Sequence, residues 1–466
     1  MSRLTAVILA AGLGTRMKSA LPKVLHPIAG RPLLHYAVRA AFEAGVERAV
    51  VVTSGHRQID ELLARDFGDR VSTVVQDPPR GTGDAARIGI EQVNTERVLI
   101  LCGDTPLVRA EELAQLVSAL AQPGAEELSL MTCALESPHG YGRVLRDAAG
   151  QVSEVREQRD LTSPEQQAVR EVNAGMYAGK TEVLRRALAQ LEPNNSQGEY
   201  YLTDVIAWVA RSSRVTGVLG HADALLGVND RAQLTEAEEI LLRRIRLRHA
   251  KNGVTVRGTP RIDDRVEIGE DSLIEATAVL RGGTRIGKGT VVDVGCVLTD
   301  AIIGDGVLLK PYTVIANSSV GDAAQLGPFT HVRPQSEIEA EVHLGNFVET
   351  KSTRVRRGAK ANHLAYLGDG DVGERANVGA GTIFCNYDGF NKHKTVIGAD
   401  AFIGSDSQLV APITIGRGAY VASGTTVISN VPDDALALGR IKQVNKEGYA
   451  PKLKARFAAI KAAAKK

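Results

Sequence analysis

A glycine-rich loop near the start of the chain carries residue types that suit phosphate chemistry. It reads Leu9-Ala-Ala-Gly12-Leu-Gly14-Thr-Arg16-Met, and Lys23 follows it in Leu-Pro-Lys. Glycines allow backbone N–H groups to approach a phosphate closely, and the two basic side chains add positive charge suited to a triphosphate. The loop lacks the Gly-Lys-Ser/Thr of a Walker loop and the third glycine of a dinucleotide fingerprint. On spacing alone, a plain glycine turn with solvated basic residues explains it equally well.

Two further loops follow strand-like runs. Gln76 ends one run, and Gly81-Thr82 precedes a helical run, so an amide there can pair with a base edge while the glycine avoids crowding a flat ring. Asp104, in Cys-Gly-Asp, follows another run, where a carboxylate is a natural Mg²⁺ ligand when phosphates supply other oxygens. Considered singly, each loop is better explained as a helix cap or an aspartate turn.

The elements around these loops alternate between strand-like and helix-like runs up to about residue 227. Strand-like runs lie near 5–11, 48–53, 71–76 and 97–102, and helical runs near 33–45, 58–66 and 84–93. This alternation predicts an α/β domain with a mostly parallel sheet and helices on both faces. Ligands bind past the carboxyl ends of the strands in such sheets, which is where all three loops fall.

A six-residue repeat dominates the second half of the chain, from about Val266 to Pro432. Aliphatic anchors recur every six residues from Ile268, with two one-residue slips, and the residue four past each anchor is often small or β-branched. No α-helix has a period of six, so the repeat predicts an all-β parallel β-helix with the anchors inside. The repeat is weakest over 344–372 and 378–397, where we expect loops that form a binding face.

Composition limits the remaining classes of protein. The 466 residues are too many for one core, and the net charge of +2 provides no field for nucleic acid or an anionic membrane. Aromatic residues make up 4%, which argues against base-stacking surfaces. The four cysteines form no Cys-x-x-Cys pair, and we find no signal peptide or spanning apolar run. We therefore expect a soluble cytoplasmic protein that binds neither nucleic acid nor membrane.

Together the three loops resemble those of the sugar-1-phosphate nucleotidylyltransferases. With the hexapeptide solenoid, nearly the whole chain resembles the bacterial bifunctional UDP-N-acetylglucosamine pyrophosphorylases and glucosamine-1-phosphate N-acetyltransferases. The resemblance implies a Rossmann-like nucleotidyltransferase domain at 1–228, a linker helix at 229–252, a left-handed β-helix at 253–437 and a basic tail at 438–466. The chain departs from the family pattern at three positions, with Cys102 for the frequent tyrosine, Asp84 for histidine and Ser423 for alanine.

The resemblance also implies two reactions. The solenoid would acetylate glucosamine-1-phosphate with acetyl-CoA by direct transfer in a ternary complex. The first domain would then couple N-acetylglucosamine-1-phosphate to UTP with Mg²⁺, releasing pyrophosphate. The product would supply peptidoglycan and lipopolysaccharide precursors, and related solenoids form side-by-side homotrimers.

Residue roles follow from the same resemblance. Nucleotide contacts are implied for Leu9, Ala10, Gly12, Gly14, Lys23, Gln76, Gly81 and Thr82. Sugar contacts are implied for Gly142, Glu157, Asn173 and Asn229, metal ligands for Asp104 and Asn229, and catalytic charge for Arg16 and Lys23. The acetyl-acceptor site would comprise Arg333, Lys351, Tyr366, Asn377 and Lys392. Acetyl-CoA contacts are implied for Ala380, Asn386, Tyr387, Ser405, Ser423 and Arg440.

His363 has a chemical role that suits acetyl transfer. An amine must be neutral when it attacks a thioester, and a neutral imidazole can take its proton. We expect Glu349 to fix the tautomer of His363, while Arg333, Lys351 and Lys392 supply positive charge for a sugar phosphate.

Three rival functions remain open on the sequence. One is a single-activity nucleotidylyltransferase of ADP-glucose or mannose-1-phosphate type, against which His363, Asn386 and Lys392 argue. A second is a zinc hydratase that uses His331, His343 and His363, although their spacing does not keep all three in phase. The third is a non-catalytic scaffold.

Overall fold

The computed structural model describes residues 3–121, 127–224, 227–439 and 442–464. The chain divides into two compact units. The first comprises Met1–Lys251 with Arg261–Arg265, and the second comprises Asn252–Pro260 with Val266–Lys466. Within the described residues, no helix combines the length and the apolar character needed to cross a membrane.

The first unit is built on a nine-stranded mixed sheet whose main path is β11-β7-β10-β6-β1-β4-β5. These strands are β1 (Leu4–Ala10), β4 (Arg48–Thr53), β5 (Val71–Val75), β6 (Arg97–Cys102), β7 (Leu128–Ala134), β10 (Glu171–Lys180) and β11 (Val215–Leu219). Strand β1 is parallel to β4 and β6, and β5 is parallel to β4. Only β10 runs antiparallel to its two neighbours on this path. The carboxyl ends of β1, β5 and β6 therefore meet at one edge of the sheet.

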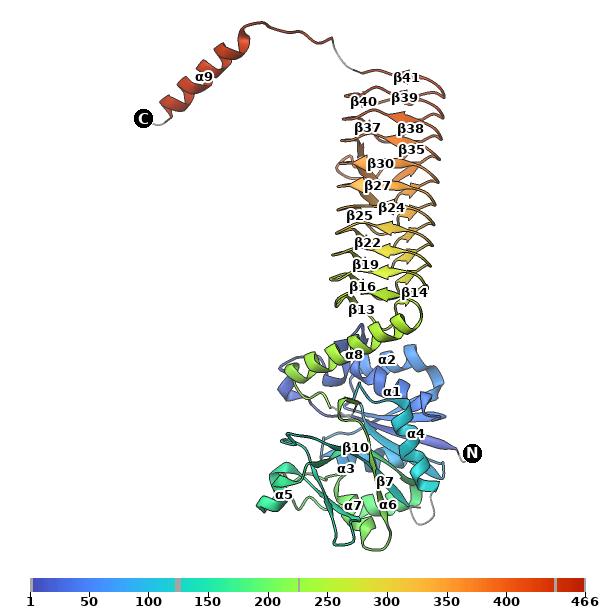
Figure 1. The fold of residues 1–466 in the computed structure, drawn as a ribbon, viewed down its shortest axis with the longest axis vertical. Coiled ribbons are helices and arrows are strands. Elements are labelled where there is room, and N and C mark those ends of the chain that lie inside the picture. Colours follow the sequence, from blue (N-terminus) through green and yellow to red (C-terminus); the bar gives the residue numbers. More distant parts are fainter. Residues whose placement is uncertain (1–2, 122–126, 225–226, 440–441, 465–466) are drawn as a thin grey trace. The chain divides into compact units, whose positions relative to one another are not determined.

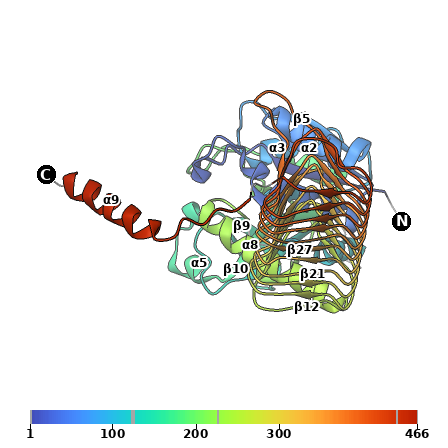
Figure 2. The ribbon, with the colours of Figure 1, turned by 90° about the horizontal axis from the view of Figure 1, so that it is seen from above.

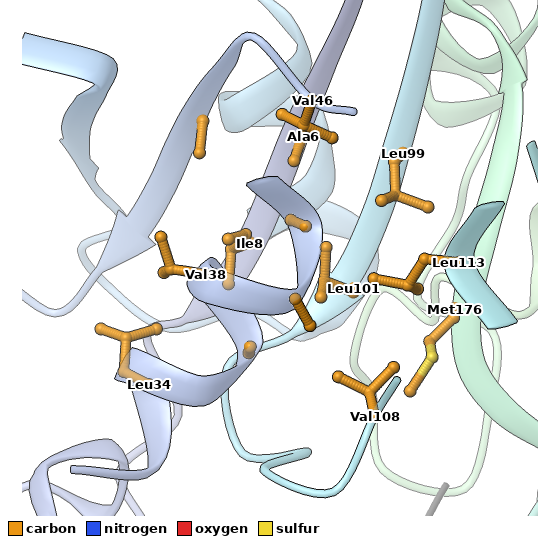
Figure 3. Close-up of a cluster of buried hydrophobic side chains, with 14 of the residues drawn as sticks. Ala6, Ile8, Leu34, Val38, Val46, Leu99, Leu101, Val108, Leu113 and Met176 are labelled. Carbon is orange, nitrogen blue, oxygen red and sulfur yellow. The ribbon is translucent and has the colours of Figure 1, made fainter. Parts of the chain in front are cut away.

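Helices cover both faces of this sheet, as the alternation in the sequence predicts. Ala6 and Ile8 of β1 pack on one side with Leu34 and Val38 of α1 (Leu33–Glu43) and Leu113 of α4 (Ala110–Ser118) (Figure 3). Helix α2 (Arg57–Phe67) belongs to the same cluster. Val7 and Leu9 pack on the other side, with α3 (Thr82–Ile90), α6 (Thr181–Ala189) and α7 (Asp204–Ala210). Successive side chains of a strand point to opposite faces, so one apolar strand serves two cores.

Smaller elements complete the first unit. They are β2 (Pro27–Ile28), β3 (Arg31–Pro32), β8 (Arg143–Arg146), β9 (Val152–Arg156) and α5 (Pro164–Ala168). The unit also contains α8 (Arg231–Lys251), whose start is capped by Asp230, because Gln233 donates its backbone N–H to Oδ1 of Asp230 at 2.9 Å. Ala237, Leu241 and Ile245 form the buried stripe of this helix.

The second unit contains a left-handed parallel β-helix, which confirms the prediction from the six-residue repeat. An eleven-stranded sheet runs from β12 (Thr255–Val256) to β41 (Leu436–Ala437), a nine-stranded sheet from β14 (Glu267–Ile268) to β38 (Ile413–Ile415), and a third sheet ends at β40 (Thr426–Val427). The coils stack on one another in Figure 1 and superpose along the stack in Figure 2.

The burial of side chains follows the repeat. Anchors such as Ile274, Leu309 and Ile403 are fully buried, and so are the small residues four places after them, Ala278, Thr313 and Ser407. The small hydroxyl residues also bond across coils, since Ser272 donates to the carbonyl of Gly287 at 2.8 Å. A polar side chain inside the coil is thus satisfied by the backbone of the next coil.

The expected interruption over 344–372 is wrong. The coils continue without insertion through β27 (His343–Asn346), β28 (Glu349–Lys351), β29 (Arg354–Val355), β30 (Lys360–His363), β31 (Tyr366–Gly368) and β32 (Gly370–Val372). Thr350 and Ala361 fill the buried anchor positions there. The aliphatic pattern fails because threonine and alanine replace larger residues, while the backbone geometry is kept.

A true insertion follows β34 (Ile383–Cys385), before β35 (Thr395–Ile397) resumes the stack. It is a short excursion closed by an antiparallel bridge between Tyr387 and Lys392. Near the C-terminus, α9 (Tyr449–Ala463) buries no side chain. This exposed helix lies within 438–466, the segment for which the resemblance implies a basic tail.

Candidate active sites

A pocket of about 370 Å³ lies at the sheet edge where β1, β5 and β6 end. It is lined by Leu9, Ala10, Ala11, Gly12, Leu13, Gly14, Thr15, Lys23, Val24, Gln76, Pro79, Gly81, Thr82, Ala85, Cys102, Asp104 and Glu199. The structure thus brings together every residue for which the sequence suggested a nucleotide contact. The parallel register of the strands causes this, because it places their following loops side by side.

The glycines of this pocket differ in what an added Cβ would meet. A Cβ at Gly12 would meet no protein atom within 4 Å, so it could crowd only a bound ligand. A Cβ at Gly14 would lie 2.6 Å from Cβ of Lys23, and Gly14 has a φ of +60°. Gly81, with a φ of +108°, would crowd the carbonyl of Tyr200 at 2.6 Å. The contacts of Gly81 within the protein therefore require a glycine at this position, independently of any nucleobase that binds beside it.

Arg16, Lys23, Asp104 and Asn229 form one polar network. Arg16 donates from Nη2 to Oδ1 of Asn229 at 3.1 Å. Lys23 is in contact with the Asp104 carboxylate and reaches the same Asn229 oxygen at 3.4 Å. Two oxygen ligands from distant parts of the chain therefore lie around one ammonium group.

Asp104 and Asn229 fit a Mg²⁺ site. Magnesium prefers hard oxygen ligands, and it usually takes one or two from the protein and the rest from phosphates and water. In the part of the chain that the structure describes, no cluster of three or more His, Cys, Asp or Glu residues could hold a metal by itself. A metal here would therefore depend on substrate oxygens.

The three other residues for which a sugar contact is proposed, Gly142, Glu157 and Asn173, lie together where β10 meets the hairpin of β8 and β9. Asn173 donates its backbone N–H to the carbonyl of Gly142 at 2.9 Å, and a Cβ at Gly142 would lie 3.2 Å from Oε1 of Glu157. Burial raises the pKa of Glu157, and Thr203 donates to its Oε1 at 3.3 Å. The raised pKa reflects a carboxyl group held in a poorly solvated position.

Cys102 connects this group to the pocket. A Cβ at Gly175, two residues after Asn173, would lie 3.5 Å from its sulfur. Burial raises the pKa of Cys102 to about 12, so the thiol stays neutral. It is therefore an uncharged wall residue and no candidate nucleophile.

In the solenoid, five residues form a column along one corner of successive coils. Asn346 pairs with His363 in the register of β27 and β30. The registers of β30 with β33 (Asn377–Val378), of β33 with β36 (Phe402–Ile403), and of β36 with β39 (Tyr420–Val421) continue the column. Its members are Asn346, His363, Ala380, Ser405 and Ser423. The proposed base and three proposed acetyl-CoA residues are thereby aligned, which the sequence alone did not indicate.

The proposed acetyl-acceptor residues lie mostly on the other side of that corner. Arg333 and Lys351 follow residues that pair in the register of β25 (His331–Val332) and β28, so they stack on adjacent coils. Tyr366 stacks above Glu349, and Asn377 stacks above Lys360 in the neighbouring sheet.

The expected contact of Glu349 with His363 is wrong. Glu349 accepts a hydrogen bond from Arg333 at 2.7 Å. His363 instead places Nδ1 at 3.0 Å from Oδ1 of Asn346. An amide oxygen can only accept, so Nδ1 carries the proton and Nε2 is left with a lone pair. The sequence analysis did not identify Asn346 as the partner of His363, because Asn346 resembles an ordinary residue of the repeat. Its position one coil before His363 could have indicated the contact.

The excursion after β34 carries the other proposed residues. Asn386 is buried and donates to Asp369 at 2.5 Å, and Lys392 lies 5.1 Å from the ring centre of the exposed Tyr387. A Cβ at Gly368 would meet both the Tyr366 hydroxyl and the Asn386 amide. This glycine therefore lets two of the proposed site residues approach. Arg440 lies outside the described residues.

These features define a class of protein: a nucleotidyltransferase unit joined to a hexapeptide acyltransferase unit. Family models agree, since residues 6–170 match a MobA-like NTP transferase domain. Residues 265–300 match the hexapeptide repeat of succinyl-transferase, and residues 394–429 match a bacterial transferase hexapeptide of six repeats.

Full-length relatives give the particular family. The chain is 56% identical over 470 residues to the bifunctional protein GlmU of Sorangium cellulosum, covering 99% of this chain and 98% of that protein. It is 50% identical to the bifunctional protein GlmU of Anaeromyxobacter sp. strain Fw109-5, over 97% and 93% of the two chains. The GlmU of Trichlorobacter lovleyi is 45% identical, over 95% and 97%. The chain belongs to the GlmU family of bifunctional enzymes.

Proposed function

We propose that the chain makes UDP-N-acetylglucosamine in two steps, acetylation of glucosamine-1-phosphate by acetyl-CoA and then uridylyl transfer from UTP. The observation that carries this proposal is the meeting of Arg16, Lys23, Asp104 and Asn229 at a nucleotide-sized pocket, in a chain of this family. The same proposal assigns 1–228 to uridylyl transfer, 253–437 to acetylation, 229–252 to a linker and 438–466 to a tail.

Uridylyl transfer needs positioning and charge more than acid–base chemistry. The phosphate of N-acetylglucosamine-1-phosphate is already ionised, so it can attack the α-phosphorus of UTP without a general base. Arg16 and Lys23 would stabilise the negative charge that grows as the bond to pyrophosphate breaks. Gly142, Glu157 and Asn173 would hold the sugar. Mg²⁺ held by Asp104 and Asn229 would neutralise part of the phosphate charge.

Acetyl transfer would use the column and the corner beside it. The Nε2 lone pair of His363 accepts a proton from the amine of glucosamine-1-phosphate, whose nitrogen then bonds to the acetyl carbonyl carbon. The carbon–sulfur bond breaks, and coenzyme A leaves as a thiolate that takes up a proton. Arg333 and Lys351 would bind the sugar phosphate, and Ala380, Ser405 and Ser423 would lie along acetyl-CoA.

An exposed apolar ladder supports the proposal of a homotrimer. Tyr312, Phe329, Phe347 and Leu364 occupy one corner on consecutive coils, each 47–59% exposed and each with a positive φ. The rings of Tyr312 and Phe329 stack at 5.2 Å, and those of Phe329 and Phe347 stack at 5.4 Å. Bulky residues seldom adopt a positive φ, and a row of them facing water indicates a surface that another chain covers. Leu364 adjoins His363, so the site would lie at this interface.

The proposed location is the cytoplasm. UTP and acetyl-CoA are cytoplasmic metabolites, and the four cysteines are free, with two of them buried. Free thiols persist in reducing compartments.

Two substitutions test the two-site proposal. Asp104→Ala should abolish UDP-sugar formation and leave acetylation intact, whereas His363→Ala should do the reverse. Asp223→Ala, which removes a half-exposed carboxylate that pairs with Arg109 and Arg244, serves as a control for loss of charge. Equal loss of both activities in either folded variant would contradict the proposal.

Substrate assays separate the rival functions. Thiol release from acetyl-CoA that depends on glucosamine-1-phosphate would exclude a single-activity nucleotidylyltransferase and a scaffold. Pyrophosphate release measured with UTP, ATP and GTP against each sugar phosphate should be greatest for UTP with N-acetylglucosamine-1-phosphate. Stoichiometric zinc that is essential for turnover would instead favour the hydratase.

A further inference from the structure

The amide of Gln76 is held in one orientation at the wall of the pocket. Its side chain is 4% exposed, and its Nε2 donates to the carbonyl of Gly81 at 3.1 Å and to Oδ2 of Asp84 at 2.9 Å. A carbonyl and an ionised carboxylate can only accept, so the nitrogen must face them. Oε1 is the atom of this amide that remains available to a ligand.

Asp84 is buried, and its carboxylate accepts several hydrogen bonds. Its side chain is 1% exposed, and it accepts hydrogen bonds from Arg80 at 3.1 Å and Arg87 at 2.6 Å in addition to Gln76. Burial alone would raise the pKa of Asp84, but the hydrogen bonds from Gln76, Arg87 and Arg80 outweigh it and hold the pKa below its ordinary value. The carboxylate therefore remains an acceptor at neutral pH.

We propose that Asp84 is a specificity-determining positioning residue, which fixes Gln76 as a hydrogen-bond acceptor toward the nucleobase. This inference rests on the proposed nucleotide site. Uracil presents a donor, its N3–H, where cytosine presents a lone pair. An acceptor fixed opposite N3 favours uracil and repels cytosine, whereas an amide free to rotate could serve both.

Asp84→Asn tests this directly. An asparagine at this position can offer Gln76 either its oxygen or its nitrogen, so only the carbonyl of Gly81 still favours a single orientation of the Gln76 amide. We expect the ratio of kcat/KM for UTP to that for CTP to fall about tenfold, through the KM values. Dissociation constants for UTP and CTP, measured by calorimetry on the full chain, should show the same change.

Arg80→Gln is the matched control. It removes a charge from the same cluster, but it leaves both acceptors around Nε2 of Gln76 in place. The UTP to CTP ratio of Arg80→Gln should stay within about twofold of the parent protein, since one half-exposed ion pair contributes little. If Asp84→Asn does not fold, Asp84→Ser gives the same test, because its hydroxyl also either donates or accepts.

The outcomes separate two failures. A parent protein that transfers no pyrimidine nucleotide would overturn the proposed function itself. A parent protein that prefers UTP, together with an unchanged ratio in folded Asp84→Asn, would overturn the role of Asp84 alone. An equal fall of the ratio in Arg80→Gln would also overturn it, because loosening of the loop would then suffice.

Discussion

Replacing Asn346 by alanine should slow acetyl transfer by weakening the orientation of His363. Nδ1–H of the imidazole donates a hydrogen bond to Oδ1 of Asn346 at 3.0 Å. That bond selects the tautomer in which Nε2 carries the lone pair, and Nε2 is the atom that must accept the proton of the amine. Without it, part of the population would hold the wrong tautomer or the wrong ring angle.

The size of the effect follows from the kind of bond. A neutral hydrogen bond contributes about 0.5–1.5 kcal/mol, and His363 is exposed, so water can partly replace the lost partner. With about 1.4 kcal/mol for each factor of ten, kcat should fall roughly two- to tenfold. Removing the base itself with His363→Ala should cost about 10²–10⁴-fold. Asn346 is thus a positioning residue with a much smaller effect than the base.

The assay is the pH dependence of kcat for thiol release from acetyl-CoA. Asn346→Asp should move the acid limb of the profile to higher pH, because a carboxylate favours the imidazolium form, which cannot act as a base. Asn362→Ala, beside His363, is the control and should change neither kcat nor the profile. Full kcat in Asn346→Ala, with an unshifted profile in Asn346→Asp, would refute the reasoning.

Three further perturbations have defined outcomes. Glu157→Gln should raise Tm at neutral pH but not at acid pH. The pKa of Glu157 is raised in the folded protein, so its carboxyl group contributes stability at acid pH and loses that contribution as the pH rises through the folded-state pKa. The same substitution should raise KM for the sugar phosphate. Phe329→Asp should give a protein that sediments as a monomer, keeps uridylyl transfer and loses acetylation. A Phe329→Asp protein that remains a trimer would contradict the proposed interface. Ile428→Asp, at an exposed position outside the ladder, is the control. Gly12→Ala should raise KM for UTP about tenfold at unchanged Tm, whereas Gly14→Ala should lower Tm by roughly 2–4 °C or more; equal effects on Tm would contradict the assignment of Gly12 to the ligand.

The sequence predicted both architectures because each depends on a short-range period. Alternating strands and helices indicated the parallel sheet, and the six-residue spacing indicated the solenoid. The same reasoning failed over 344–372, where Thr350 and Ala361 occupy anchor positions. Backbone pairing between coils keeps the register there, because it does not depend on the size of the inward side chain.

The sequence by itself predicted the loops that line one pocket and the six-residue period of the coils. Only the tertiary structure decided which side chains are hydrogen-bonded to one another. His363 is bonded to Asn346 and not to Glu349, and Gln76 is bonded to Asp84. A hydrogen bond depends on distance and angle between residues that parallel register or a tight turn brings together. Neither residue type nor spacing reveals that geometry, so the orientations of the His363 ring and of the Gln76 amide become visible only in the fold.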